Sequence, residues 1–420
     1  MSLGADVVVV GAGAAGLWCA WRAAARGARV LVLEKTARTG TKILASGGTR
    51  CNLTTTLDGR GAARLFGARG ERFLGHALRI LPPTQVRAHF AELGVPTVEA
   101  LLEKIFPASQ RARDVRDALE SAARAAGARF VFDAQVARLA PCAAGWRVEL
   151  ERGEPVECAN VVLAVGGKSY PRTGTTGDGY AWLATLGLEL VDPVPALVPL
   201  ISPEIWVRDL AGIALQDAEL RHVAPQGASI ERRRRPLVFT HAGLSGPAAM
   251  DLAEPIARAE SSGEPRAVAI DLYPEWSEDR LRAELMDAAA RPGAPRLSQA
   301  LERAGMAPPP KRLLARIAAT SGALGDDPRL NALSRSSRHA LVQNLKGLRV
   351  ALTGTTGFDH AEVTAGGLAL GEVDPGTCRV RRYAGLFAIG EILDLQGPIG
   401  GLNFQAAFAT AEVAALELTR

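Results

Sequence analysis

The chain has 420 residues, of which 48% are hydrophobic and 22% are charged, a composition typical of a soluble globular protein with two or three packed units. The formal net charge of +5 favours an anionic partner, whether a phosphate-bearing cofactor, a nucleic acid or an acidic small molecule. The chain has no run of roughly eighteen apolar residues, so the composition excludes a membrane span.

The N-terminus and the cysteines together predict a cytoplasmic protein. The opening MSLGADVVVVGAG lacks the basic region and the long apolar region of a signal peptide, and its apolar run predicts a strand. The cysteines form no C-x-x-C pair and have no histidine at metal-ligand spacing, so we expect neither a disulfide framework nor a metal site. They are Cys19, Cys51, Cys142, Cys158 and Cys378.

The first fifty residues predict a strand–turn–helix–strand unit. Asp6–Val10 is a β-branched run, typical of a parallel strand that is buried on both faces. It enters 11-GAGAAG-16, which matches G-x-G-x-x-G, and an alanine-rich helical segment follows. Arg29–Glu34 predicts the second strand, which ends in an acidic residue.

This unit predicts the binding site of a dinucleotide. Gly11 permits the tight turn, Gly13 lets a pyrophosphate approach the backbone, and Gly16 lets the helix pack closely on the strand. The helix N-terminus offers free N–H groups to the phosphates, and Glu34 can accept hydrogen bonds from ribose hydroxyls. The pattern does not separate NAD from FAD. The nucleotide-binding residues that we expect are Gly11, Gly13, Ala14, Ala15, Gly16, Glu34 and Lys35.

The next segment, 40-GTKILASGGTRCN-52, favours a flavin. It is polar and rich in glycine, with no helical or strand period, where an NAD-binding dehydrogenase would continue into a crossover helix. Such a segment can lie along an extended cofactor and offer N–H groups and positive charge to phosphate or ring oxygens; the alternative is a solvent loop. The residues that we expect at the cofactor are Lys42, Ser46, Gly47, Gly48, Arg50, Cys51 and Asn52.

Three later segments indicate the same cofactor. Residues 128–169 predict a strand, a hairpin (Trp146–Glu151 and Val156–Cys158) and an apolar strand Val161–Val165 that ends in two glycines. Residues 171–187 predict a glycine-rich turn and a helix, and residues 383–415 predict a strand, a glycine-rich loop and a helix that starts near Asn403–Gln405. These segments add Val136, Gly166, Gly167, Thr173, Gly174, Gly390, Glu391, Gly400, Gly401, Asn403, Phe404 and Gln405 to the expected cofactor site.

The middle of the chain has a different character. The proline-spaced residues 192–203 predict a linker, and residues 205–274 contain short alternating runs that predict a β-rich domain. Residues 277–345 predict helices, each bounded by Gly or Pro. The chain returns to the first domain by about residue 362.

Together these segments resemble a known family. The set GTKILASGGTRCN, AVGGKSYPRTGTTGDGY, FTHAGLSGP, AEVTAGGLALGEV and GEILDLQGPIGGLNFQAA is similar to the bacterial BaiN/YhiN-like (aminoacetone-oxidase-like) FAD-dependent oxidoreductases. The resemblance spans almost the whole chain. It departs at Thr49, where the family usually has Gly, and at Leu402, where it usually has Tyr.

The resemblance implies an α/β fold with a Rossmann-like, glutathione-reductase-type FAD domain. That domain would consist of residues 1–191 and 362–420. An inserted β-barrel-like substrate domain would cover residues 192–276 and 346–361, and a small helical subdomain residues 277–345. The catalytic cleft is then expected between the FAD domain and the insert.

Three residues are candidates for proton transfer. His241 lies in the glycine-flanked turn 239-FTHAGLSGP-247, which is either a structural turn or a turn that brings the imidazole to the flavin. Cys51 and Tyr170 are the other two. The same turn lacks G-x-S-x-G, which excludes a hydrolase elbow, and 166-GGKS-169 lacks the upstream Gly of a P-loop.

The basic run 232-RRRR-235 raises the possibility of RNA as a partner. We expect it to be a solvated hairpin tip, and no RNA-binding motif accompanies it. The RNA hypothesis nevertheless stands, because some members of the family are linked to dihydrouridine formation in ribosomal RNA.

The sequence therefore predicts an FAD-dependent oxidoreductase with hydride transfer through flavin N5. It would reduce an activated C=C bond or oxidise a small amine, with NADPH or NADH as a transient reductant. The alternatives are an RNA-modifying flavoenzyme and a cofactor-binding regulatory protein. No stable protein partner is implied.

Overall fold

The computed structural model of the chain describes residues 5–223, 229–264 and 266–420. It contains two compact units, Met1–Pro195 with Phe358–Arg420, and Ala196–Gly357. Residues 1–4 of the predicted FAD domain, and residues 224–228 and 265 of the predicted β-rich domain, lie outside the described residues.

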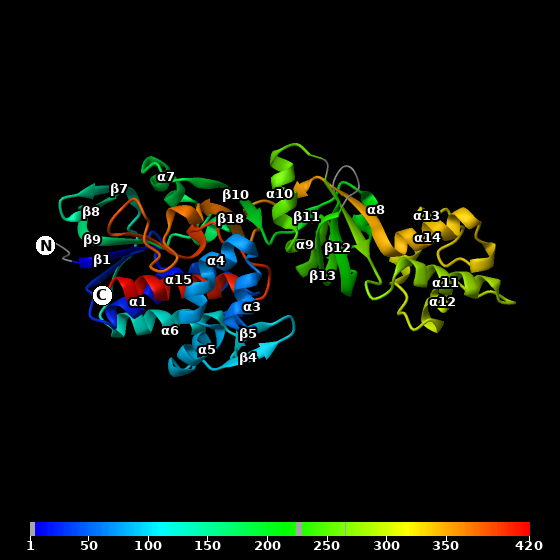
Figure 1. Ribbon diagram of the computed structural model, residues 1–420, viewed down its shortest axis with the longest axis horizontal. Helices are drawn as coiled ribbons and strands as arrows, with labels where there is room; N and C mark the ends of the chain where they lie inside the picture. Colours follow the sequence, from blue (N-terminus) through cyan, green and yellow to red (C-terminus); the bar gives the residue numbers. More distant parts are fainter. Residues whose placement is uncertain (1–4, 224–228, 265) are drawn as a thin grey trace. The chain divides into compact units, whose positions relative to one another are not determined.

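The first unit is built on a mainly parallel sheet that is covered by helices (Figure 1). Its strands are β1 (Ala5–Val10), β2 (Val30–Leu33), β3 (Thr54–Thr55), β4 (Thr97–Ala100), β5 (Lys104–Pro107), β6 (Arg129–Val131), β7 (Val136–Cys142), β8 (Gly145–Leu150), β9 (Val156–Leu163), β10 (Leu190–Ala196), β18 (Val363–Leu368) and β19 (Leu386–Ala388). Its helices are α1 (Ala14–Ala24), α2 (Thr41–Ala45), α3 (Gly59–Arg64), α4 (Gly67–Ile80), α5 (Pro83–Glu92), α6 (Ala112–Ala125), α7 (Asp178–Thr185), α15 (Leu402–Glu417) and the short 3-10 turns η1 (Pro171–Thr173), η3 (Leu370–Glu372) and η4 (Gly390–Ile392).

Strand β9 organises the large sheet, whose order is β6-β2-β1-β9-β8-β7 with β19 also paired to β9. Along one edge β9 pairs in parallel with β1. Along the other edge its first half pairs antiparallel with β8, and its second half pairs in parallel with β19. The predicted strands Val156–Cys158 and Val161–Val165 are therefore parts of one continuous strand, Val156–Leu163, because β1 pairs with it from Cys158 to Leu163, across the change of partner on its other edge.

Helices α1 and α15, from opposite ends of the chain, pack side by side on this sheet (Figure 1). Trp18 of α1 and Phe408 of α15 are fully buried, with ring centroids 4.9 Å apart. Glu412 of α15 accepts hydrogen bonds from Trp18 Nε1 at 2.9 Å, Arg22 Nε at 2.8 Å and Arg26 Nη2 at 2.7 Å. Since Glu412 is only 4% exposed, its charge depends on these donors.

The unit also contains structure that the sequence patterns did not predict. Residues 41–45, within the segment without a visible period, form the short helix α2. Residues 54–125 form α3 to α6 and the small antiparallel sheet β3-β5-β4. This sheet holds the end of the glycine-rich segment, since Leu53 N, directly after it, donates to Ile105 O at 2.9 Å.

The second unit has a curled antiparallel sheet and a group of helices (Figure 1). Its elements are β11 (Leu200–Ile201), α8 (Ile205–Asp209), β12 (Ala214–Val223), β13 (Ser229–Phe239), β14 (Gly243–Ser245), α9 (Pro247–Met250), α10 (Ala253–Ser261), β15 (Arg266–Asp271), α11 (Glu278–Ala290), α12 (Leu297–Arg303), α13 (Lys311–Thr320), η2 (Leu330–Ala332), α14 (Arg335–Gly347), β16 (Leu348–Leu352) and β17 (Gly354–Thr355). Helices α9 and α10 lie within the predicted β-rich region, and their pattern was missed.

The sheet of this unit closes toward a barrel. Its order is β16-β15-β12-β13-β14-β11-β17, and only Thr353 separates the two edge strands along the chain. Thr353 N donates to Ile201 O at 2.9 Å, and Ser202 Oγ donates to Ala351 O at 2.8 Å. The two edges are thus held near one another, which gives the barrel-like curvature.

The sequence predicted the arginine run at a solvated hairpin tip, and this prediction is wrong. Residues 232–235 lie inside β13 and pair with β12. Arg233 pairs with Glu231, Arg234 with Asp217, and Arg235 with Asp251 at 3.5 Å. Carboxylates therefore balance most of this charge.

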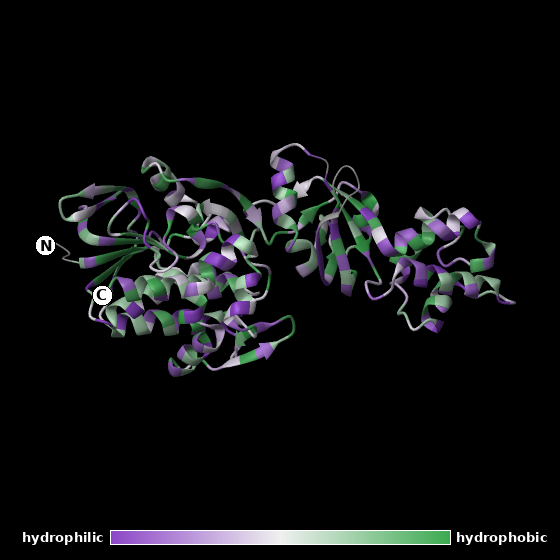
Figure 2. Ribbon diagram, in the orientation of Figure 1, coloured by the Kyte–Doolittle hydropathy of each residue, from purple (hydrophilic) through white to green (hydrophobic). Residues whose placement is uncertain are grey.

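Hydropathy explains which elements form the core. Figure 2 shows that the central parallel strands of the first unit are hydrophobic along their length, whereas its helices alternate between hydrophobic and hydrophilic residues. Val7, Val8 and Val9 of β1 are all 0% exposed, as expected of a parallel strand that is buried on both faces.

We predict that Glu412→Gln destabilises the first unit. The variant keeps one acceptor but leaves Arg22 and Arg26 without a carboxylate. These arginines are 21% and 26% exposed, so we expect the free energy of unfolding to fall by about 2 kcal/mol, below the range for fully buried pairs. Urea denaturation measures this. Glu417→Gln, which removes exposed ion pairs at the end of the same helix, should change it by about 0.5 kcal/mol.

The difference in free energy of unfolding between the wild type and Glu412→Gln should also depend on pH. Burial by itself raises the pKa of Glu412, but hydrogen bonds from Arg22 and Trp18 and the charge of Arg22 outweigh it, so the pKa lies below its ordinary value of 4.5. This stabilisation is present above pH 4.5 and is lost as the pH falls through the lower pKa of the folded protein. A wild-type advantage that stayed constant down to acid pH would contradict the assignment.

Candidate functional site

The glycine-bearing segments that the sequence singled out converge within the first unit. Gly40 N, at the start of the polar segment, donates to Ala12 O in the β1–α1 turn at 2.8 Å. A Cβ added to Gly390 would lie 2.9 Å from the Cβ of Ala15, so η4 touches the same turn. Segments from the two ends of the chain therefore border one site.

The β1–α1 turn has the shape that a pyrophosphate site requires. A Cβ on Gly16 would lie 1.9 Å from Gly11 O, and a Cβ on Gly11 would lie 2.6 Å from Ala164 O. Both glycines are thus required by the close packing of helix and sheet. A Cβ on Gly13, in contrast, would meet nothing within 4 Å. The open side of Gly13 is where a phosphate can approach the backbone N–H groups of α1.

Glu34 lies at the end of β2, beside this turn. Its Oε2 accepts a hydrogen bond from Ala12 N at 2.8 Å, and its Oε1 accepts from Thr36 N at 2.9 Å and Thr36 Oγ1 at 2.8 Å. These bonds hold the carboxylate against the turn, in the position from which it can bind ribose hydroxyls. A dinucleotide thus fits the residues at this end of the site.

The polar segment forms α2 and a glycine turn. Gly47, Gly48 and Thr49 have φ of 55°, 65° and 68°, so the Thr that replaces the Gly of the family has a left-handed backbone. Ser46 donates through Oγ to Ile43 O at 2.7 Å. Arg50 is exposed, and its guanidinium lies 4.6 Å from the centroid of the Phe106 ring.

Cys51 and Gln405 have no surface left for a ligand, since both are 0% exposed. Burial raises the pKa of Cys51 to about 12, so its thiol is a poor proton donor at neutral pH. Gln405 Nε2 donates to Leu81 O at 2.7 Å, and Gln405 Oε1 accepts from Thr54 Oγ1 at 2.6 Å. This pair fastens α15 to the polar segment, and we no longer expect either side chain to contact a cofactor.

Lys42 and Glu391 form the charged centre of the site. Lys42 Nζ lies 2.6 Å from Glu391 Oε2 and 2.6 Å from Ser169 Oγ. Ser169 Oγ also donates to Glu391 Oε1 at 2.7 Å, and Thr364 N donates to the same oxygen at 2.9 Å. The positive charge that we expected from Lys42 is therefore balanced by Glu391.

A buried hydroxyl borders this network. Tyr180 is 7% exposed, and its hydroxyl has no hydrogen-bond partner among the described residues. It lies 3.1 Å from the position of a Cβ on Gly167. Burial, followed by the charges of Glu391 and Asp394, raises the pKa of Tyr180, so the hydroxyl stays protonated and can donate.

The C-terminal loop closes the opposite end of the site. A Cβ on Gly401 would lie 2.1 Å from Thr54 O, so only glycine permits this approach of the loop to the polar segment. Gly397 N donates to Asn403 Oδ1, and Asn403 Nδ2 donates to Gly397 O, both at 2.9 Å. Phe404 stacks on Phe408 with ring centroids 6.1 Å apart. Gly400 is buried next to Gly401.

The remaining predicted residues belong to other parts of the fold. Asn52 Oδ1 accepts from Ile105 N at 3.1 Å, and Val136 begins β7 and is 5% exposed. Tyr170 is 38% exposed, and Tyr170 N donates to Phe358 O at 2.8 Å. His241 belongs to the second unit, where it is exposed in the turn between β13 and β14.

Sequence reasoning missed Ser169, Thr364 and Tyr180. Lys168 N and Ser169 N both donate to Thr364 Oγ1, at 2.8 Å and 3.0 Å. Thr364 belongs to the segment AEVTAGG, which carries part of the family resemblance. That resemblance could have indicated Thr364 as a site residue. Tyr180 follows the predicted glycine-rich turn at helical spacing, and only its tertiary neighbours mark it.

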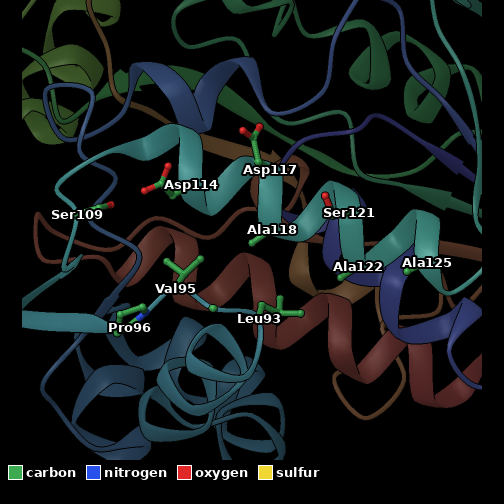
Figure 3. A pocket seen from close by; sticks show the side chains of 11 residues that line it. Leu93, Val95, Pro96, Ser109, Asp114, Asp117, Ala118, Ser121, Ala122 and Ala125 are labelled. Atoms are coloured by element: carbon green, nitrogen blue, oxygen red, sulfur yellow. The ribbon is translucent and has the colours of Figure 1, made fainter.

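A groove of about 540 Å³ lies elsewhere on the first unit, between α6 and the loop after α5. Figure 3 shows Asp114, Ala118 and Ser121 along α6, with Val95 and Pro96 opposite. Asp114 is paired with Arg111, and Asp117 with Arg116. Among the described residues that line the groove, none belongs to the glycine-bearing segments, so it is not part of the cofactor site.

Comparison with known proteins identifies the family. The model of the HI0933-like protein Rossmann domain matches residues 5–417. The chain belongs to the HI0933-like Rossmann-domain family. The predicted resemblance to the BaiN/YhiN-like flavoproteins is thus confirmed, and so is the Rossmann-type FAD domain of a flavin-dependent oxidoreductase.

Two relatives are similar over their whole length. A "Ribosomal RNA dihydrouridine synthase" of Escherichia coli (strain K12) is 30% identical over 98% of both chains. A "3-dehydro-bile acid delta(4,6)-reductase" of Clostridium scindens is 30% identical over 97% of both chains. Among solved structures, 3-ketosteroid-delta4-(5alpha)-dehydrogenase from Rhodococcus jostii RHA1 matches 99% of this chain and 97% of its own, with a TM-score of 0.52 and 17% identity, and shares the fold.

Among the residues that the structure describes, no helix has the length and apolar character needed to cross a membrane. No group of three or more His, Cys, Asp or Glu side chains among them is placed to bind a metal ion.

We predict that Gly13→Ala weakens FAD binding without disturbing the fold. The added methyl meets no protein atom, and Gly13 has φ −76° and ψ −167°, which alanine tolerates. The methyl occupies the side from which the pyrophosphate approaches, so we expect affinity to fall at least about tenfold, or about 1.4 kcal/mol. Calorimetric titration of the flavin-free protein measures it. Gly75→Ala, in equally open space on α4, is the control and should bind normally; equal affinities for all three proteins would refute this position for the phosphates.

We predict that Thr49→Gly stabilises the protein. Thr49 pays the steric cost of a left-handed backbone, which exceeds the extra chain entropy of glycine. We expect the free energy of unfolding of the flavin-free protein to rise by about 1 kcal/mol in urea denaturation. Thr56→Gly, at an exposed position that is not left-handed, should lower it by about 0.5 kcal/mol. Destabilisation by both variants would show that the strain at Thr49 is negligible.

Proposed function

We propose that the protein is an FAD-dependent reductase that saturates a C=C bond conjugated to a carbonyl group, with NADPH or NADH as the electron donor. The observation that carries the proposal is the match to the HI0933-like family over residues 5–417, together with the open phosphate-binding turn at Gly13. The names of the two kinds of relative then indicate the reaction.

The names of these relatives describe one kind of chemistry. Dihydrouridine is uridine whose ring C=C bond, which is conjugated to a carbonyl, has been saturated. A delta(4,6)-reductase of a 3-dehydro-bile acid acts on C=C bonds conjugated to the 3-oxo group. Saturation of such a bond by a flavin adds a hydride to the carbon distant from the carbonyl and a proton to the neighbouring carbon. Oxidation of a small amine, the other chemistry that the sequence left open, has no support in these names.

The residues of the first unit would bind FAD, which supplies hydride transfer through N5 when it is bound. Gly13 and the N-terminus of α1 would hold the pyrophosphate, and Glu34 the adenosine ribose. Since Glu391 balances Lys42, the positive potential at the far end would come from the free N–H groups of α15, whose N-cap is Gly401. Arg50, exposed beside that segment, would add to it.

His241 is the residue that we propose as proton donor. Its imidazole is exposed, in a turn that is fixed by hydrogen bonds from Thr240 N to Gly243 O at 2.8 Å and from Gly243 N to Thr240 Oγ1 at 3.1 Å. A histidine in a rigid turn can deliver a proton at neutral pH. Tyr170 is the second candidate.

A second candidate function is the same reaction on uridine in ribosomal RNA. The names of two relatives, from Escherichia coli and Haemophilus influenzae, support it. The arginine run offers it limited support, because most of these side chains have carboxylate partners. The two candidates differ in the substrate and not in the chemistry.

The test is anaerobic turnover of the flavin-loaded protein. We expect NADPH or NADH to remove the long-wavelength flavin absorbance, and a conjugated enone to restore it with formation of the saturated ketone. The matched alkene without the carbonyl should not react. Anaerobic loss of the flavin absorbance on addition of a small amine, without NADPH or NADH, together with no reoxidation by the enone, would contradict a reductase.

The same assay separates the substrates and tests His241. Ribosomal RNA from a strain that lacks dihydrouridine should restore the absorbance only if the second candidate is correct, and its binding should weaken steeply with salt. His241→Asn should slow the step with the alkene by about a hundredfold but leave reduction by NADPH or NADH unchanged. His339→Asn, an exposed histidine in α14, is the control.

A further inference from the structure

A short segment between β9 and α7 is tied to residues at the end of β2. This strap, residues 170–178, starts directly after Ser169 and ends at the first residue of α7, Asp178. Tyr170, Gly174 and Gly177 have φ of 54°, 94° and 83°, so the strap turns sharply at three places. Its course depends on the groups to which it is tied.

An ion pair and a hydroxyl tie the strap to the end of β2. Lys35 Nζ lies 2.7 Å from Asp178 Oδ2 and also donates to Thr176 Oγ1. Thr176 Oγ1 in turn donates to Asp178 Oδ1 at 2.7 Å. The three side chains form a closed set in which both oxygens of the carboxylate and the hydroxyl are used.

The anchor of the strap adjoins the predicted ribose-binding acid. Lys35 follows Glu34 in the chain, and Thr36 donates two hydrogen bonds to the Glu34 carboxylate. A Cβ on Gly174 would lie 2.9 Å from Thr36 Cγ2, so the strap is packed directly against this segment. Thr41 Oγ1 also donates to Thr173 O. A nucleotide bound to Glu34 and Gly13 would therefore lie next to the strap.

The ion pair is partly shielded from solvent. The Lys35 side chain is 23% exposed and that of Asp178 is 30% exposed. Burial alone would raise the pKa of Asp178, but the hydrogen bonds from Lys35 and Thr176 lower it below its ordinary value. The carboxylate is therefore ionised at neutral pH, and the attraction to Lys35 is screened only in part.

We propose that Lys35, Thr176 and Asp178 form a latch that holds the strap over the adenosine half of FAD and sets the rate at which the cofactor leaves. Lys35 is then a positioning residue, and the sequence-based expectation that it binds the cofactor directly is replaced, because its ammonium group is already paired. The inference rests on the binding of FAD by this site, which is part of the proposed function.

The test compares the release of FAD from the holoprotein and its variants. Lys35→Met and Asp178→Asn remove one partner each, and the retained flavin is followed over time by absorbance during continuous ultrafiltration. We expect release to be about fivefold faster in each, which corresponds to about 1 kcal/mol, with no further gain in the double variant. Added salt should speed release from the wild type and leave Lys35→Met unaffected.

The matched control is Arg29→Met. Arg29 flanks the other end of β2 and pairs with Asp6, so it shares the strand and the type of interaction but not the strap. Its release rate should equal that of the wild type. Thermal unfolding of the flavin-free proteins shows whether the variants fold, and Thr176→Val, which keeps both charges, supplies a milder variant.

The outcomes separate the latch from the cofactor assignment. Wild-type release rates in Lys35→Met and Asp178→Asn, or equal acceleration in Arg29→Met, would overturn the latch while the flavin assignment stands. A reconstituted wild-type protein that retained no FAD would overturn both. Faster release that is confined to the latch variants and is not additive would support the proposal.

Discussion

The close approach of backbone to backbone in the β1–α1 turn is the constraint on which the rest of the first unit depends. Gly16 and Gly11 have no room for a side chain, since an added Cβ would lie within 1.9 Å and 2.6 Å of carbonyl oxygens. This approach places α1 directly on β1 and β9. It also leaves the N–H groups of α1 facing the open side of Gly13. A fold and a phosphate site thus follow from the same contact.

The other segments are held around this turn by polar contacts between residues far apart in the chain. Lys42, Ser169, Thr364 and Glu391 come from four separate segments and form one hydrogen-bonded network. The network makes the centre of the site nearly neutral, because the Lys42 charge is matched by Glu391.

Sequence reasoning found the elements whose signal is local. The β-branched run of β1, the glycine spacing of 11–16 and the acidic end of β2 all stand in continuous stretches, and the structure has each in place. It failed where distant strands or side chains decide the structure. Residues 156–163 are one strand because β1, β8 and β19 pair with them. The arginine run lies inside β13, where carboxylates from other segments pair with it. Gln405 was wrongly predicted to bind the cofactor. Its hydrogen-bond partners, Thr54 and Leu81, belong to distant segments of the chain, so the local sequence does not reveal them.

By itself, the sequence determined the family, the Rossmann-type FAD domain and the glycines that build the phosphate turn, because short-range backbone sterics and a characteristic set of motifs carry that information. Only the tertiary structure decided which charges remain available. Lys42, Lys35 and most of residues 232–235 read as free cations in the sequence, and each has a carboxylate partner in the fold. The reason is physical: a partly buried charge is stable only beside its counter-charge, and the position of that partner depends on how distant segments pack.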